Sequence, residues 1–184
     1  KGPAPFRILC PRVLLLVLLL LLIGHVPSRA APRVEHVRQG KAASALVTSG
    51  QAGRNLVFGT AFGIHEGGFF LTSEEVVRRI GSARAATLVI RAGEKNERSF
   101  RVRVVRSDAK LGLGLLKAAK GPEKVDVLQL GTVHDLIETT EVVTFSHSRS
   151  VKVEDKKTIF PATAVHLGLV SSLRKSDGEL EEIR

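Results

Sequence analysis

Two adjacent carboxylates, Glu74 and Glu75, follow a glycine-rich apolar run in the sequence. Paired carboxylates can work as general acid and general base when they flank one bond. On a helix, however, neighbouring side chains point about 100° apart, so these two do not readily flank one bond. Ser73 is a favourable N-cap, and the helix dipole favours acids in the first turn and bases such as Arg78 and Arg79 near the end. The pattern therefore predicts a helix start rather than an acid–base pair.

The histidines show no metal-ligand spacing. His65-Glu66 begins like the zinc-protease motif His-Glu-x-x-His, but Phe69 occupies the position of the second histidine. The two glycines after Glu66 predict a turn, so two ligands cannot share one helix face. The other histidines of the mature chain, read as isolated polar residues, are His36, His134, His147 and His166. We expect no metal site and no cofactor.

Two other binding patterns are incomplete. Gly112-x-Gly114 opens like a dinucleotide loop, but Lys117 stands where the third glycine belongs. One predicted strand carries a row of basic residues that can grip an anion, although we expect a solvated strand face. The row comprises Arg98, Arg101, Arg103 and Arg106. Four of the +10 formal charges lie in residues 1–30, and the remaining 10 − 4 = +6 favours acidic partners or anionic surfaces. The lack of Tyr and Trp argues against nucleic acid.

A signal peptide is predicted at residues 1–30. Arg7 and Arg12 precede an apolar run at Val13–Ile23, and small residues lead up to Ala30. This order is typical of a secretory signal that is cleaved after Ala30. The sequence therefore predicts a secreted or periplasmic protein. Because the sequence contains no Met, we expect the chain to be incomplete at its front.

A membrane anchor is the alternative interpretation of the same segment. The apolar run rises about 17 Å as a helix, well short of a hydrocarbon core about 30 Å thick. Contact with a membrane is therefore expected only if the signal remains uncleaved. The single cysteine, Cys10, lies within the signal. A mature chain without a thiol excludes disulfides and cysteine nucleophiles.

The mature chain reads as a series of short strands. Residues 31–54 are expected to form a flexible lead. Leu56–Ile64 and Phe69–Thr72 alternate around a glycine turn and predict one hairpin, and Thr87–Arg91 with Phe100–Arg106 predict a second. Further strands are expected at Leu113–Ala118, Val127–Leu130, Glu141–Ser146 and Ala162–Val170, with an exposed loop at Lys152–Lys157. The spacing favours a mainly β fold, an antiparallel barrel or sandwich.

Two segments of the first half resemble one protein family. Residues 59–77, GTAFGIHEGGFFLTSEEVV, resemble the first hairpin of trypsin-like serine proteases of the bacterial HtrA/Deg type, which reads Gly-Ser-Gly-Phe and then Leu-Thr-Asn-x-His-Val-Val. In that family the histidine is the general base, and Glu75 stands in its place. Residues 108–117, DAKLGLGLLK, resemble the strand Asp-x-x-x-Asp-Leu-Ala-Leu-Leu-Lys. Its second aspartate orients the histidine, and Gly112 stands there.

Two later segments extend the resemblance over Leu56–Arg184. Residues 128–131 with 141–145 are similar to the passage into the second barrel, and residues 163–173 are similar to the Gly-Ile-Val-Ser strand. The resemblance implies a double antiparallel β-barrel over residues 55–184. The first barrel is expected at about 55–120 and an incomplete second barrel at about 125–184. The family's nucleophilic serine belongs to a segment that follows Arg184.

The resemblance implies a protease scaffold that has lost its chemistry. Histidine can relay a proton near neutral pH, whereas a glutamate, with a reference pKa near 4.3, is a weak base there. With base, orienting aspartate and nucleophile all missing, the loss in turnover is of order 10⁶. We therefore expect an inactive domain that binds peptide segments by strand addition. The alternatives are an active serine endopeptidase whose nucleophile lies in a missing C-terminal part, and a gene fragment without independent function.

Overall fold

The computed structural model places most of the chain after the predicted signal peptide. It describes Gly2 and residues 34–49, 56–81, 86–120, 124–133, 136–154, 157–176 and 179–183. The chain divides into Lys1–Ala31 and a second compact unit, Pro32–Arg184, which contains all the described strands. Apart from Gly2, the predicted signal, with Cys10, lies outside the described residues, and so does His134. Within the described part, no helix has the length and apolar character needed to cross a bilayer.

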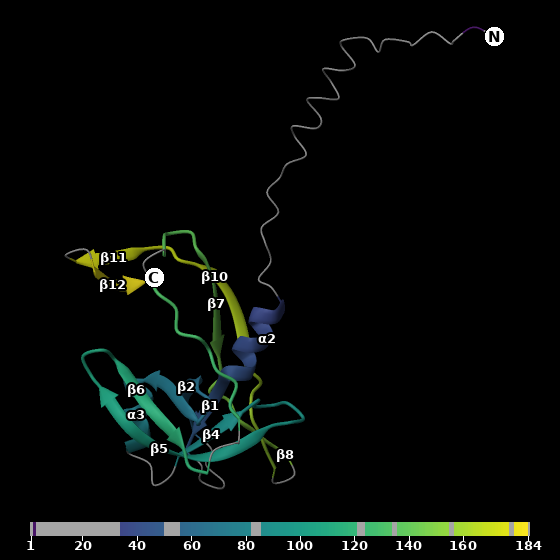
Figure 1. Cartoon of the computed structure of the whole chain (residues 1–184). Coiled ribbons are helices and arrows are strands. Elements are labelled where there is room, and N and C mark those ends of the chain that lie inside the picture. The colour runs from purple at the N-terminus through teal and green to yellow at the C-terminus, as the bar shows by residue number, and fades with distance from the viewer. Residues whose placement is uncertain are drawn as a thin grey trace. The chain divides into compact units, whose positions relative to one another are not determined.

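Six strands of the first half close into an antiparallel barrel (Figure 1). They are β1 (Ser44–Thr48), β2 (Val57–His65), β3 (Phe69–Ser73), β4 (Ala86–Ile90), β5 (Arg98–Asp108) and β6 (Leu113–Ala118). Their order around the barrel is β1-β2-β3-β6-β5-β4, and β4 pairs back onto β1. Both predicted hairpins are confirmed, β2 with β3 and β4 with β5. Because the barrel is closed, its strands have no free edge.

The barrel interior is an apolar core made by alternate residues of its strands. Ala45 and Val47 of β1 point inward with Phe70, Leu88 and Leu116, all of which are almost fully buried. The period-two alternation of the strands places these side chains on one face of the sheet. The barrel is therefore filled by side chains and is not a channel.

A second apolar cluster lies on the outer face of the barrel. Leu46, between the two inward residues of β1, points outward beside Val89 of β4. Val151 and Phe160 of the second half pack against this cluster. The outer face of β2, β1 and β4 is therefore covered by the second half of the chain.

The second half consists of three two-stranded antiparallel sheets among the described residues. They pair β7 (Glu141–Ser146) with β10 (Ala164–Leu169), β8 (Lys152–Glu154) with β9 (Lys157–Ile159), and β11 (Leu173–Ser176) with β12 (Glu179–Ile183). The predicted fold class is confirmed as a mainly β chain with a closed six-stranded antiparallel barrel, and the described strands of the second half form separate two-stranded sheets.

Two helices accompany the barrel in the described part of the chain. The helix α2 (Val34–Ala43) leads directly into β1 and contacts β7 as well. Its Gly40 lies so close to the Phe145 ring that a Cβ atom would overlap it. The helix α3 (Glu74–Gly81) follows β3 and buries Val76 and Ile80 in the barrel core. It begins directly after Ser73, as predicted.

The structure corrects three predictions from the sequence. Residues 34–48, expected within a flexible lead, form α2 and the first barrel strand. Val127–Leu130 is not a strand; Val125 is buried in the barrel core and the Leu128 amide donates to the Gly63 carbonyl at 2.9 Å. The expected loop at Lys152–Lys157 contains β8 and the start of β9, which pair as an exposed hairpin.

Candidate functional site

The residue that precedes Glu75, the position matched to the family's histidine, contacts Gly112, the position matched to its aspartate. The backbone N–H of Glu74 donates to the Gly112 carbonyl at 2.9 Å, which joins the first turn of α3 to the turn between β5 and β6. That turn is held by Asp108, whose Oδ1 accepts the Leu111 N–H at 3.0 Å. Glu75 and Gly112, which the sequence motifs match to the family's histidine and aspartate, therefore lie in the same part of the fold.

The Glu75 carboxylate is engaged within its own helix. It pairs with Arg79 one turn later, and Glu74 pairs in the same way with Arg78 at 2.9 Å. The Glu75 side chain is 55% exposed, so this ion pair is largely solvated. Both pairs have the spacing that stabilises a helix surface, with the acid preceding the base by four residues. The two carboxylates stabilise the helix start, as the sequence predicts.

Gly112 contributes only backbone to this place. Its φ of +66° lies in the left-handed region, where glycine carries no steric penalty. A Cβ built there would meet no atom within 4 Å, so space for a side chain exists. The side chain itself is missing, and no carboxylate at this position can orient a base.

The other described histidines do not take over the role of a base here. His65 Nδ1 accepts the Gly67 N–H at 2.9 Å and its ring lies edge-on to Phe69. His166 lies 3.3 Å from the Ser146 hydroxyl on the exposed β7–β10 sheet. His36 is exposed on α2. None of these contacts includes Glu75 or Gly112.

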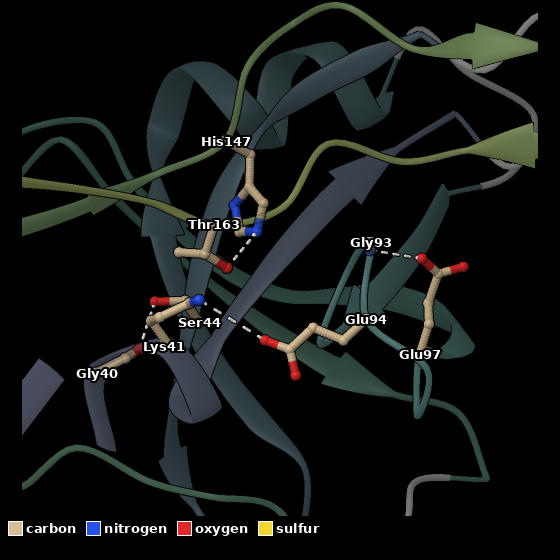
Figure 2. A network of polar contacts seen from close by, with 8 residues as sticks. All are labelled: Gly40, Lys41, Ser44, Gly93, Glu94, Glu97, His147 and Thr163. Carbon is tan, nitrogen blue, oxygen red and sulfur yellow. Dashed lines mark hydrogen bonds and ion pairs between the residues drawn. The ribbon is translucent and has the colours of Figure 1, made fainter. Parts of the chain in front are cut away.

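His147 is the buried histidine of the described chain, and sequence reasoning treated it only as an isolated polar residue. Its ring lies between two hydroxyls, 3.1 Å from Thr60 of β2 and 3.0 Å from Thr163 (Figure 2 shows the second contact). Its backbone N–H also donates to the Thr60 hydroxyl at 3.1 Å. Burial lowers its pKa from 6.5 to about 4. The ring is therefore neutral near pH 7.

The Thr60 hydroxyl accepts the backbone N–H of His147 and also lies within hydrogen-bond distance of Nδ1. Thr163 lies within the same reach of Nε2. Because each hydroxyl can donate or accept, the two threonines satisfy both ring nitrogens of a neutral imidazole in either tautomer. Since Thr60 and His147 are 87 residues apart, no local pattern in the sequence could indicate this contact. The network joins the barrel to the second half, and none of its hydrogen bonds includes Glu75 or Gly112.

A second set of polar contacts lies around α2 and the turn between β4 and β5 (Figure 2). Ser44 donates to the Gly40 carbonyl at 2.8 Å, and Lys41 lies 3.9 Å from Glu94. The Gly93 N–H donates to a Glu97 carboxylate oxygen at 2.7 Å. Of these contacts, the Lys41–Glu94 pair joins α2 to the β4–β5 turn of the barrel, and none of them includes Glu75 or Gly112. Among the described residues, no cluster of His, Cys, Asp or Glu is arranged to hold a metal ion.

The basic row predicted from the sequence lies on β5. The guanidinium of Arg98 lies 5.9 Å from the centre of the Phe100 ring. Arg101, Arg103 and Arg106 are exposed. None of these three makes an ion pair with another described residue. Gly114 and Lys117, from the discarded dinucleotide motif, both belong to β6.

Comparison with known proteins agrees with this geometry. The family model for the trypsin-like peptidase domain matches residues 59–183. No curated protein matches the sequence.

Three solved structures are similar to this chain. The apo protease domain of MamO from Magnetospirillum magneticum has a TM-score of 0.59 at 18% identity, over 74% of this chain and 64% of that one. Deg5 gives 0.55 at 15% identity, over 79% and 65%. The HtrA-type protease AlgW, solved with a decapeptide, gives 0.57 at 14% identity, over 80% and 48%. This chain thus spans less than two thirds of each, and at these identities the likeness shows the fold.

Proposed function

The chain belongs to the trypsin-like peptidase domain family, and we propose that it is a non-proteolytic member that binds polypeptide segments outside the cytoplasm. The proposal rests on the residues that occupy the positions matched to the family's histidine and aspartate. Glu75, in place of the general base, is paired with Arg79, and Gly112, in place of the orienting acid, contributes only a carbonyl that accepts the Glu74 N–H. A proton relay needs a base that both accepts and returns a proton, and a side chain that holds this base in place.

An active-serine label tests the loss of proteolysis. A fluorophosphonate reacts with a serine only when a neighbouring base activates it. We expect no labelling of the folded full-length protein above the level of a heat-denatured sample, with an active trypsin-like protease as positive control. Saturable labelling of the folded protein alone, abolished by substitution of one serine, would establish an active endopeptidase and overturn the proposal.

The β7–β10 sheet supports the peptide-binding half of the proposal. Within the described chain each of these strands pairs only with the other, so each presents one edge free of described strands. Leu167 of β10 is 65% exposed beside the edge. An unpaired edge with neighbouring apolar side chains can take an extended peptide by strand addition.

A peptide array tests this binding mode. We expect saturable binding of extended, apolar peptides and its loss in Leu167→Lys, because a charge on a strand edge opposes the pairing of another strand. Ile137→Lys is the matched control, since Ile137 is equally 65% exposed but lies outside the strands. Equal binding by both variants would contradict an edge on β10, and no binding by the wild-type protein would contradict the function.

The proposed location outside the cytoplasm is supported by the sequence of residues 1–30. Expression of the whole chain in a secreting host should release a protein that begins at Ala31, as read by N-terminal sequencing. Retention of the entire segment on protein that stays inside the cell would contradict it.

A further inference from the structure

The barrel carries a second candidate binding surface, on the outer side of β3, β6 and β5. Cross-strand partners there form rows, because residues directly opposite in an antiparallel pair share a face. One row is Leu71, Leu115 and Arg106. The neighbouring row towards the β5–β6 turn ends in Leu113 and Asp108. We call this outer side the open face.

A hollow of about 300 Å³ is sunk into the open face. It is lined by Leu71, Arg106, Asp108, Leu111, Leu113, Gly114 and Leu115. Leu111 is 67% exposed and Leu113 is 40% exposed at its margin. The volume lies at the lower end of the range of about 300–1,000 Å³ for small-molecule sites. It therefore suits one or two aliphatic side chains better than a cofactor.

The charges around the hollow are unevenly distributed. Arg106 lines it, and Arg103 and Arg101 continue along β5, without an ion pair to any described residue. The acidic lining residue, Asp108, already accepts the Leu111 N–H at 3.0 Å. Lys117 on β6 is also engaged, above the Phe69 ring at 4.1 Å and with the Gly67 carbonyl. The free charge at the hollow is thus positive and comes from arginines, which suit carboxylate partners.

The closed barrel restricts how a partner can dock here. Since β3, β6 and β5 are paired on both sides, no backbone edge is free for strand addition, and a partner must contribute side chains. From Arg101 to Arg106 the strand rises roughly 17 Å, which equals about three turns of helix. An amphipathic helix presents apolar and acidic side chains over such a length.

We infer that the open face docks an acidic amphipathic helix of a protein partner, with an aliphatic side chain in the hollow and carboxylates on the arginines of β5. The inference goes beyond the proposed peptide binding at the β7–β10 edge, and it does not depend on the absence of proteolysis. Glu75 and Gly112 do not line the hollow.

The test uses a fluorescent helical peptide with leucines along one face and glutamates elsewhere, titrated onto the full chain by fluorescence anisotropy. We expect saturable binding that weakens with salt, and a loss of about tenfold in affinity in each of Leu111→Ser and Arg106→Gln. Lys152→Gln is the matched control, because Lys152 is an exposed cation on β8, and its affinity should stay within about twofold of the wild type.

Three outcomes would overturn the inference. Equal binding of a peptide with serines in place of the leucines would show that the surface binds polyanions in general. Absence of binding would show that the open face does not dock such a helix. Sedimentation showing a dimer that Leu111→Ser dissociates would assign the hollow to a second copy of the chain. Unchanged urea midpoints of the variants ensure that lost binding does not reflect unfolding.

Discussion

The barrel has two outer faces that differ in what covers them. On the covered face, made by β2, β1 and β4, Leu46 and Val89 pack under Val151 and Phe160 of the second half. On the open face, made by β3, β6 and β5, Leu113 remains 40% exposed and a hollow is left. One outer side of the barrel is thus buried and contributes to stability, whereas the other is left exposed and available for contact. An apolar residue on the outside of a barrel acquires its role from what lies above it.

The largest expected difference is in stability, between removing a leucine side chain from the covered face and removing one from the open face. Leu46→Ala should lower the free energy of unfolding by about 2–5 kcal/mol, because Leu46 is fully buried and a cavity would remain. Leu113→Ala, on the open face, should cost less than about 1 kcal/mol because much of its side chain is already in water. Urea denaturation of both variants measures the difference. Equal costs would show that the open face is also covered.

The next largest effect is a dependence of the free energy of unfolding on pH, which we expect from His147 on the covered face. The unfolded chain binds a proton at His147 near pH 6.5, whereas burial lowers its pKa in the folded protein to about 4. The unfolded state therefore holds more protons in this window, and the free energy of unfolding should fall as the pH drops from about 6.5 to about 4. The loss is at most about 3 kcal/mol.

Urea titrations at several pH values measure this slope. His147→Gln, which removes the imidazole, should show a smaller fall over the same window. If the substitution left the slope unchanged, groups other than His147 would cause the pH dependence. The contacts of His147 with Thr60 and Thr163 would then not be sensitive to acid.

A smaller effect distinguishes the two helices. Gly40→Ala in α2 should destabilise by about 1–3 kcal/mol, because the new methyl group would overlap the Phe145 ring of the second half. The control, Gly81→Ala at the end of α3, meets no atom within 4 Å and should be neutral or slightly stabilising. Thermal melts compare the two variants. A neutral Gly40→Ala would show that α2 does not hold the second half closely.

The smallest effect is expected at the helix that starts beside the open face. Glu75→Gln removes a solvated pair with Arg79, and such pairs contribute about 0.3–0.5 kcal/mol. Chemical denaturation should show no larger change, and Glu35→Gln, which breaks the exposed pair with Arg38 on α2, serves as its control. A cost above about 1 kcal/mol for Glu75→Gln alone would indicate a role beyond its own helix.

The elements that sequence reasoning recognised are those with a local signature. The β2–β3 and β4–β5 hairpins alternate apolar and polar residues around glycine turns, and α3 begins with acids and ends with bases. The barrel strand β1 was missed because all five of its residues are buried. Its inner side packs in the barrel core and its outer side under the second half, so it lacks the alternation of a half-exposed strand.

The features of the candidate site also differ in whether a local sequence signature predicts them. The positions matched to the family's histidine and aspartate follow from the motifs that surround them, and a backbone hydrogen bond joins Gly112 to Glu74, the neighbour of Glu75. The ion pairs of Glu74 and Glu75 follow from helical spacing alone. The neutral His147 between Thr60 and Thr163 does not, because its partners lie 87 and 16 residues away along the chain.

The sequence by itself determined the two hairpins of the barrel and the helix start, because each depends on neighbours within a few positions of the chain. Only the tertiary structure decided which strand closes the barrel, which outer face is covered and where the hollow remains. Those features depend on burial between segments far apart in sequence, and whether a leucine such as Leu46 or Leu113 is buried is set by what packs over it.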